Sequence, residues 1–121
     1  MNKLLKTDNP VTNTLNAVVE QTIQDYLFDR LYLYRIIKGE DKILKTIERI
    51  EMTVDEFWND VVADLKECRD FFMEGDYKAL YDNRSGEEVI AGLNKRFIEE
   101  VIPEYERTGK WSYKKKEAES E

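Results

Sequence analysis

The segment YLFDRLYLYRII, residues 26–37, constrains the fold more than any other part of the chain. Nine of its twelve residues are apolar or aromatic. Because an α-helix turns by about 100° per residue, these side chains point in every direction around a helical axis. A helix that is apolar on all sides must be covered on all sides, by its own chain or by a partner. We therefore treat every other segment as a candidate cover for this one.

The composition favours a single all-α domain. The chain has 121 residues, of which 41% are hydrophobic, and this suffices for one modest core. Only five glycines and two prolines are present, so there is little turn material for a many-stranded β fold. An alternative for residues 31–37 is a β-strand, because this part is rich in aromatic and β-branched residues. No second strand offers to pair with it, so we expect helix throughout.

Hydrophobic periodicity and capping patterns divide most of the chain into four main helices, bundled around the first. Their expected bounds are residues 10–38, 41–52, 54–74 and 86 to a stop or kink at Pro103. Two capping boxes, Thr53 with Glu56 and Ser85 with Glu88, mark the starts of the third and fourth helices. Gly92 lies inside the fourth helix, where it predicts a close approach by another backbone.

The predicted domain organisation is a mobile lead over residues 1–9, one helical domain over 10–106 and a flexible charged tail over 107–121. The first helix would be about 43 Å long, whereas a compact domain of this size is roughly 35 Å across. We therefore expect this helix to protrude, to break or to run through an oligomer interface. Its aromatic residues suit either the core or a homodimer interface. These candidates are Tyr26, Phe28, Tyr32 and Tyr34.

Charge and residue types exclude several classes of function. The net charge is −7, so we expect no direct binding of nucleic acid, which needs clustered lysines and arginines. The absence of histidine excludes histidine-based catalysis and histidine metal sites. The single Cys68 lies on the predicted buried face of the third helix, where a thiol is usually inert. We expect no cofactor, no signal peptide, no membrane span and a cytoplasmic location.

The third helix carries an acidic stripe, which is the strongest functional feature of the sequence. Its carboxylates fall within about 120° on a helical wheel, and Phe71 lies among them. The predicted partner-binding residues are Glu56, Asp60, Asp64, Glu67, Asp70, Phe71 and Glu74. We expect a small non-enzymatic regulator, inhibitor or adaptor that docks on a basic protein surface, or imitates nucleic-acid phosphates. The alternative is a solvated helix face, with Phe71 covered by residues 76–85.

A second pattern pairs Glu48-Arg49-Ile50-Glu51 with Glu67-Cys68-Arg69-Asp70. This spacing is similar to the Mg²⁺ motif of the all-α nucleotide pyrophosphatases of the MazG type. The resemblance implies that four carboxylates on neighbouring helices hold Mg²⁺ against a triphosphate. These residues are Glu48, Glu51, Glu67 and Asp70. A tight turn at Thr53 within one chain would exclude this arrangement.

The sequence does not decide between several roles for the C-terminal segment. Residues 110–116 interleave lysines with Trp111 and Tyr113, a pattern that can bind nucleic acid. Acidic residues follow at once and favour a solvated tail, while Trp111 can also fold back onto the domain. A third class of function, a structural subunit of a larger assembly, rests only on the length of the first helix.

Overall fold

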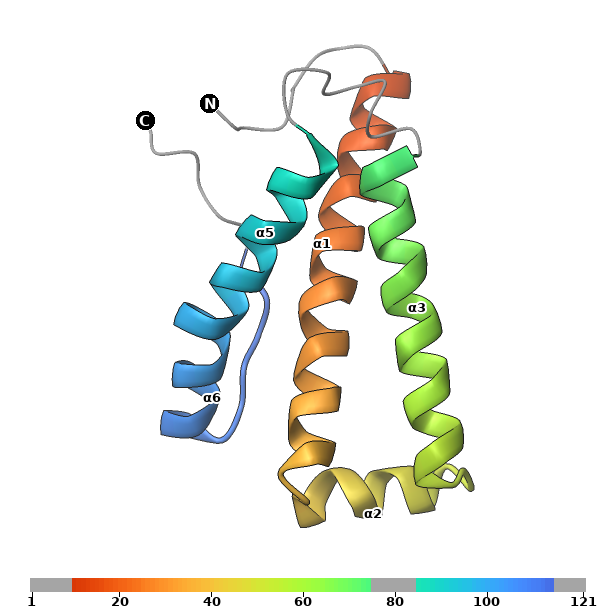
Figure 1. Ribbon diagram of the computed structural model, residues 1–121, viewed down its shortest axis with the longest axis vertical. Coiled ribbons are helices and arrows are strands. Elements are labelled where there is room, and N and C mark those ends of the chain that lie inside the picture. The colour runs from red at the N-terminus through yellow and green to blue at the C-terminus, as the bar shows by residue number, and fades with distance from the viewer. Residues whose placement is uncertain (1–9, 75–84, 115–121) are drawn as a thin grey trace.

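The protein is an all-α bundle, as the sequence predicts. The structure, a computed structural model, describes residues 10–74 and 85–114, with side chains from residue 17 onward (Figure 1). The helices are α1 (Pro10–Ile37), α2 (Asp41–Arg49), α3 (Val54–Glu74), α5 (Gly86–Arg96), the π-helical turn η1 (Phe97–Val101) and α6 (Ile102–Thr108). Because α5, η1 and α6 follow one another directly, these parts of the chain form four helical segments. The predicted lead at residues 1–9, the connector at 75–84 and the tail end at 115–121 lie outside the described residues.

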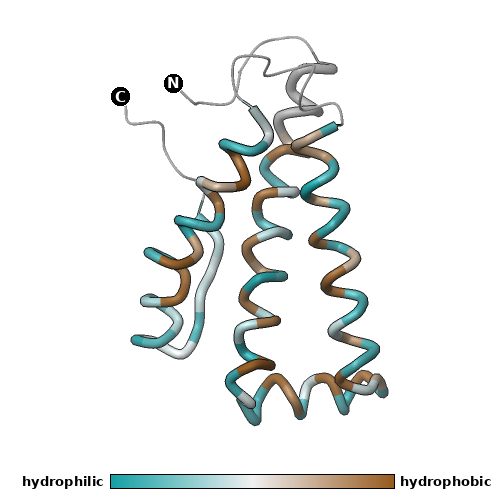
Figure 2. Tube along the Cα trace, viewed as in Figure 1, coloured by the Kyte–Doolittle hydropathy of each residue, from teal (hydrophilic) through white to brown (hydrophobic). Residues whose placement is uncertain are grey.

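The long first helix is the centre of the fold. Figure 1 shows α1 between α3 on one side and α5 with α6 on the other, with α2 crossing the end at which α1 connects to α3. Hydrophobic residues recur along each long helix at helical spacing (Figure 2). The buried cluster between these helices comprises Val19, Tyr26, Leu27, Leu31, Cys68, Phe72, Val89, Leu93, Phe97, Val101 and Tyr105. The bundle therefore covers much of α1 with its own chain.

The aromatic residues of α1 make contacts within the chain. Tyr26 is only 3% exposed, and its hydroxyl donates to Asn94 Oδ1 at 2.7 Å. The other three rings are half-buried and make edge-on contacts. These contacts are Phe28 with Trp111, Tyr32 with Phe57 and Tyr34 with Phe97, at centroid distances of 5.0, 5.6 and 6.3 Å. Tyr26 therefore belongs to the core, whereas an oligomer interface at the other three rings stays a prediction.

A tight turn separates α2 from α3. The second helix ends at Arg49, three residues before its predicted end, and Glu51 adopts a φ of 61°. The predicted capping box then begins α3. The Thr53 N–H donates to Glu56 Oε1 at 2.9 Å, and the Glu56 N–H donates to Thr53 Oγ1 at 3.0 Å. The capping box of Ser85 and Glu88 at the start of α5 is likewise present.

The fourth helical segment continues past Pro103, which the sequence predicts to end or kink it. Proline lacks an N–H donor, and its ring clashes with the carbonyl four residues earlier in a regular α-helix. Here a π-helical turn precedes Pro103, and the Ile102 N–H donates to the carbonyl of Phe97, five residues back. Gly109, with a φ of 80°, ends the segment at the position typical of a helix C-terminus.

Residues 109–114, which belong to the predicted flexible tail, fold back between α1 and α5 (Figure 1). The Trp111 ring lies against the Phe28 ring, and the centroids of the Trp111 and Tyr113 rings are 6.3 Å apart. The Tyr113 hydroxyl donates to Glu20 Oε1 of α1 at 2.6 Å. Arg96 Nη2 of α5 donates to the carbonyl of Lys114 at 2.6 Å. This C-terminal strap, residues 109–114, therefore belongs to the folded domain.

We expect Trp111→Ala to lower the free energy of unfolding by about 2 kcal/mol, because it removes a half-buried ring and its contact with Phe28. Urea denaturation of both proteins measures this difference. Ser112→Ala, at an exposed neighbouring position, is the control and should change little. Equal stability of Trp111→Ala and the wild type would show that the strap contributes nothing.

Candidate functional site

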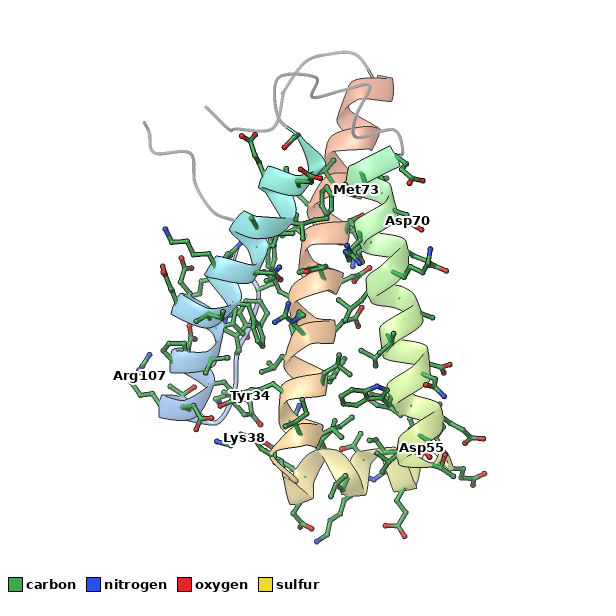
Figure 3. The ribbon with its side chains drawn as sticks, viewed as in Figure 1. Tyr34, Lys38, Asp55, Asp70, Met73 and Arg107 are labelled. Carbon is green, nitrogen blue, oxygen red and sulfur yellow. The ribbon has the colours of Figure 1, made fainter. Side chains whose placement is uncertain are left out.

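Most of the predicted acidic stripe lies on the solvent-exposed side of α3. Its exposed members are Glu56, Asp60, Glu67, Asp70 and Glu74, here called the acidic row. The row extends over about 27 Å of helix. Figure 3 shows Asp55 and Asp70 on the outer side of α3, away from α1. Lys66 Nζ lies 2.9 Å from Asp70 Oδ2, and the Glu56 side chain takes part in the capping box. The other three carboxylates of the row take part in neither contact. They belong to Asp60, Glu67 and Glu74.

Two predicted members of the stripe are only partly exposed to solvent. Phe71 is half-buried against the core cluster, with its ring 5.3 Å from that of Phe72. Asp64 is also half-buried and approaches Asp29 of α1. Both residues lie at the edge of the helical stripe that borders the buried face, and packing against the rest of the bundle covers that edge. Phe71 and Asp64 are therefore less accessible than the other members of the predicted stripe, and their part in partner binding stays a prediction.

The four carboxylates of the MazG-type resemblance do not converge within one chain. Glu48 and Glu51 lie at the end of α2 and in the turn that follows, and both are exposed. Glu67 lies about 20 Å along α3 from that turn. No candidate metal-binding group in the described ranges contains any of the four residues. The capping box at Thr53 begins a new helix between the two pairs, and this separation excludes a shared Mg²⁺ site within one chain.

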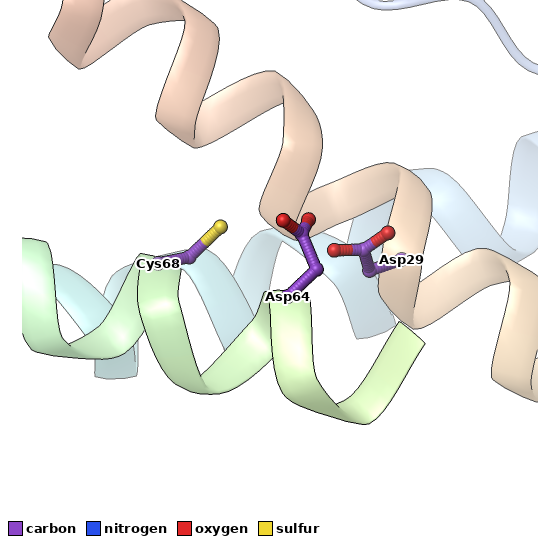
Figure 4. Close-up of side chains that lie close together, drawn as sticks. All are labelled: Asp29, Asp64 and Cys68. Atoms are coloured by element: carbon purple, nitrogen blue, oxygen red, sulfur yellow. The ribbon is translucent and has the colours of Figure 1, made fainter. Parts of the chain in front are cut away.

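A different cluster forms where α1 meets α3, and sequence reasoning missed it. One ligand atom from each of Asp29, Asp64 and Cys68 lies within 4.8 Å of the others. Figure 4 shows the two carboxyl groups directed toward each other, with the Cys68 thiol beside Asp64. Asp29 is 8% exposed, and its buried Oδ2 has no hydrogen-bond partner. The sequence clue was an aspartate inside the apolar segment 26–37, combined with the one-turn spacing of Asp64 and Cys68 on α3.

Burial and negative charge dominate the electrostatics of this cluster. Burial raises the pKa of Asp29 to about 9, and a hydrogen bond with Asp64 and the charges of Asp64 and Asp25 add to the rise. Burial likewise raises the pKa of the Cys68 thiol to about 12, with the same carboxylates contributing. Asp29 and Cys68 are therefore protonated at neutral pH.

The arginines of α1 do not neutralise the cluster. Arg30 turns toward α5, where its Nη1 donates to Asn94 Oδ1 at 2.5 Å and its guanidinium lies 4.9 Å from the Phe97 ring centroid. Arg35 pairs with Glu40 at 2.6 Å, and the Tyr105 hydroxyl also donates to Glu40. Among the residues with described side chains, no lysine or arginine forms an ion pair with Asp29 or Asp64.

Comparison of the chain with known protein families, curated proteins and solved structures gives no match. The functional argument therefore rests on the chain's own residues. Within residues 10–74 and 85–114, no helix combines the length and the apolar character needed to cross a membrane.

Proposed function

We propose that the protein is a small interaction protein whose acidic row on α3 docks on a basic surface of a protein partner. The observation that carries this proposal is the exposure of five carboxylates along one side of a single helix. Neighbouring acids one turn apart, such as Asp70 and Glu74, destabilise a helix by a few tenths of a kcal/mol per pair. This repulsion does not stabilise the fold. The same row of negative charges would, however, attract and orient a basic partner.

One end of the acidic row also offers a shaped contact. Met52, Glu56, Asn59 and Asp60 line a surface hollow beside the turn that begins α3. Met52 is half-buried and supplies the apolar part of a lining that also contains two carboxylates. A lysine or arginine side chain suits such a hollow, because its stem is apolar and its tip is charged. This hollow offers a second anchoring point, besides the one that the sequence predicts at Phe71.

The proposal predicts that reversing the freest charges of the row abolishes docking without unfolding the protein. The test variant is Asp60→Lys, Glu67→Lys and Glu74→Lys together, which spares the Lys66–Asp70 pair and the capping box. We expect at least a tenfold loss of affinity, because each reversal places a like charge against the basic partner. A photo-crosslinker at Asn59 identifies the partner, and titration with that purified partner at two salt concentrations measures the affinity.

A charge-matched variant separates the acidic row from net charge. Glu48→Lys, Glu87→Lys and Glu99→Lys change the net charge equally at exposed positions outside α3. This control should retain most of the wild-type affinity, and circular dichroism should show both triple variants folded. If the two variants weaken binding equally, or if neither does, the acidic row is not the docking surface.

A further inference from the structure

The contact between α1 and α3 holds a ligand set for a metal ion. Asp64 and Cys68 are one helical turn apart on α3, so both side chains leave the same face of the helix. Asp29 approaches them from α1, and the three ligand atoms lie within 4.8 Å of one another (Figure 4). Ligand atoms around a tetrahedral zinc ion are about 3.5 Å apart. The present spacing extends beyond that value, so the side chains must move closer together to share one ion.

Asp29 independently indicates that a cationic ligand belongs here. The residue is 8% exposed, and its buried Oδ2 has no hydrogen-bond partner. A buried carboxylate oxygen without a partner is costly, and the cost is higher when other acids are close. Asp25, one turn before Asp29 on α1, is near enough for its charge to act on both Asp29 and Cys68. No arginine or lysine with a described side chain pairs with the cluster, so a bound cation would meet no competing positive charge there.

We propose that Asp29, Asp64 and Cys68 bind a zinc-type divalent cation that ties α1 to α3. The mixed donor set selects the metal, because Mg²⁺ and Ca²⁺ prefer oxygen ligands only, whereas Zn²⁺ accepts both thiolate sulfur and carboxylate oxygen. Binding displaces the proton of the Cys68 thiol, because the thiolate is the form that ligates a metal. The fourth position is filled by Asp25 or by water.

Cobalt substitution gives a direct test, because this chain contains one cysteine and no histidine. The full-length protein is treated with a chelator, transferred to a buffer with a non-thiol reductant and titrated with Co²⁺. We expect one equivalent to bind with a thiolate-to-cobalt charge-transfer band, which only Cys68 can produce. Zn²⁺ should then displace Co²⁺ and raise the melting temperature, since a ligand that binds the folded state stabilises it. Mg²⁺ should do neither.

Two variants and a control locate the site. Cys68→Ser should abolish the charge-transfer band, and Asp29→Asn should weaken Zn²⁺ binding at least tenfold while the protein stays folded. Asp55→Asn removes an exposed carboxylate from the same helix and should leave the Zn²⁺ affinity unchanged. The proposal is overturned if the wild type shows neither the band nor a thermal shift with Zn²⁺. It is equally overturned if Asp29→Asn binds Zn²⁺ as tightly as the wild type, since the ion then lies elsewhere.

Discussion

Asp29→Asn is expected to stabilise the metal-free protein, by an amount that increases from pH 5 to pH 8. Burial raises the pKa of Asp29 from its ordinary 3.8 to about 9 in the folded state. Across this pH range the folded protein therefore keeps the Asp29 proton, while the unfolded chain has lost it. Because the folded state binds the extra proton, wild-type stability falls as the pH rises, by up to about 1.4 kcal/mol per pH unit from this group. An asparagine side chain does not bind this proton. The free energy of unfolding of the Asp29→Asn protein therefore lacks this decline with pH.

The measurement is urea denaturation of both proteins at pH 5, 6, 7 and 8 with a chelator present. The quantity to follow is the difference in the free energy of unfolding, which removes the contributions of groups common to both proteins. The groups facing Asp29 are Asp64 and Cys68 on α3 and Asp25 on α1. The pKa of the Cys68 thiol is about 12, so it stays protonated in the folded state throughout. Asp60→Asn, at an exposed position, should show no such trend, and a pH-independent difference for Asp29→Asn would contradict a raised pKa.

Local sequence patterns predicted the helices because their causes are local. Capping boxes at Thr53 and Ser85 and a glycine after the first helix act within a few residues, and the structure has these helices close to the expected positions. The end of the fourth segment was harder to predict. A π-helical turn that accommodates Pro103 depends on hydrogen-bond spacing, which the hydrophobic pattern does not report.

The candidate sites depend on how the helices are rotated against one another, and periodicity does not determine this rotation. The periodicity of the sequence predicts that the middle of the acidic stripe faces solvent, and Asp60 and Glu67 are exposed as expected. At the edges of the stripe, a small rotation decides whether a residue meets water or the neighbouring helix. Asp64 and Phe71 lie at such an edge. The meeting of Asp29 with Asp64 follows from the same rotation, so it required the tertiary structure.

The glycines of α5 show the same limitation. The sequence predicts that Gly92 marks a close approach between backbones, but a Cβ atom added there would have no atom within 4 Å. The close approach is at Gly86 in the first turn of α5. A Cβ atom at Gly86 would lie 2.4 Å from the carbonyl oxygen of Phe72 and 2.9 Å from Cα of Met73 on α3. Only the absence of a side chain at Gly86 lets α5 pack this closely against α3.

Substitution of these two glycines by alanine should therefore change stability in opposite directions. Gly86→Ala places a methyl group against the rigid backbone of α3, so α5 must move away, and we expect a loss of about 2–3 kcal/mol. Gly92→Ala fills open space in a helix and reduces the freedom of the unfolded chain, which should stabilise the protein by about 0.5–1 kcal/mol. Neither glycine has a positive φ, so backbone strain does not affect the comparison. Urea denaturation measures both changes, and a shift of the same sign in both variants would show that helix propensity, rather than the contact with α3, determines the effect at Gly86.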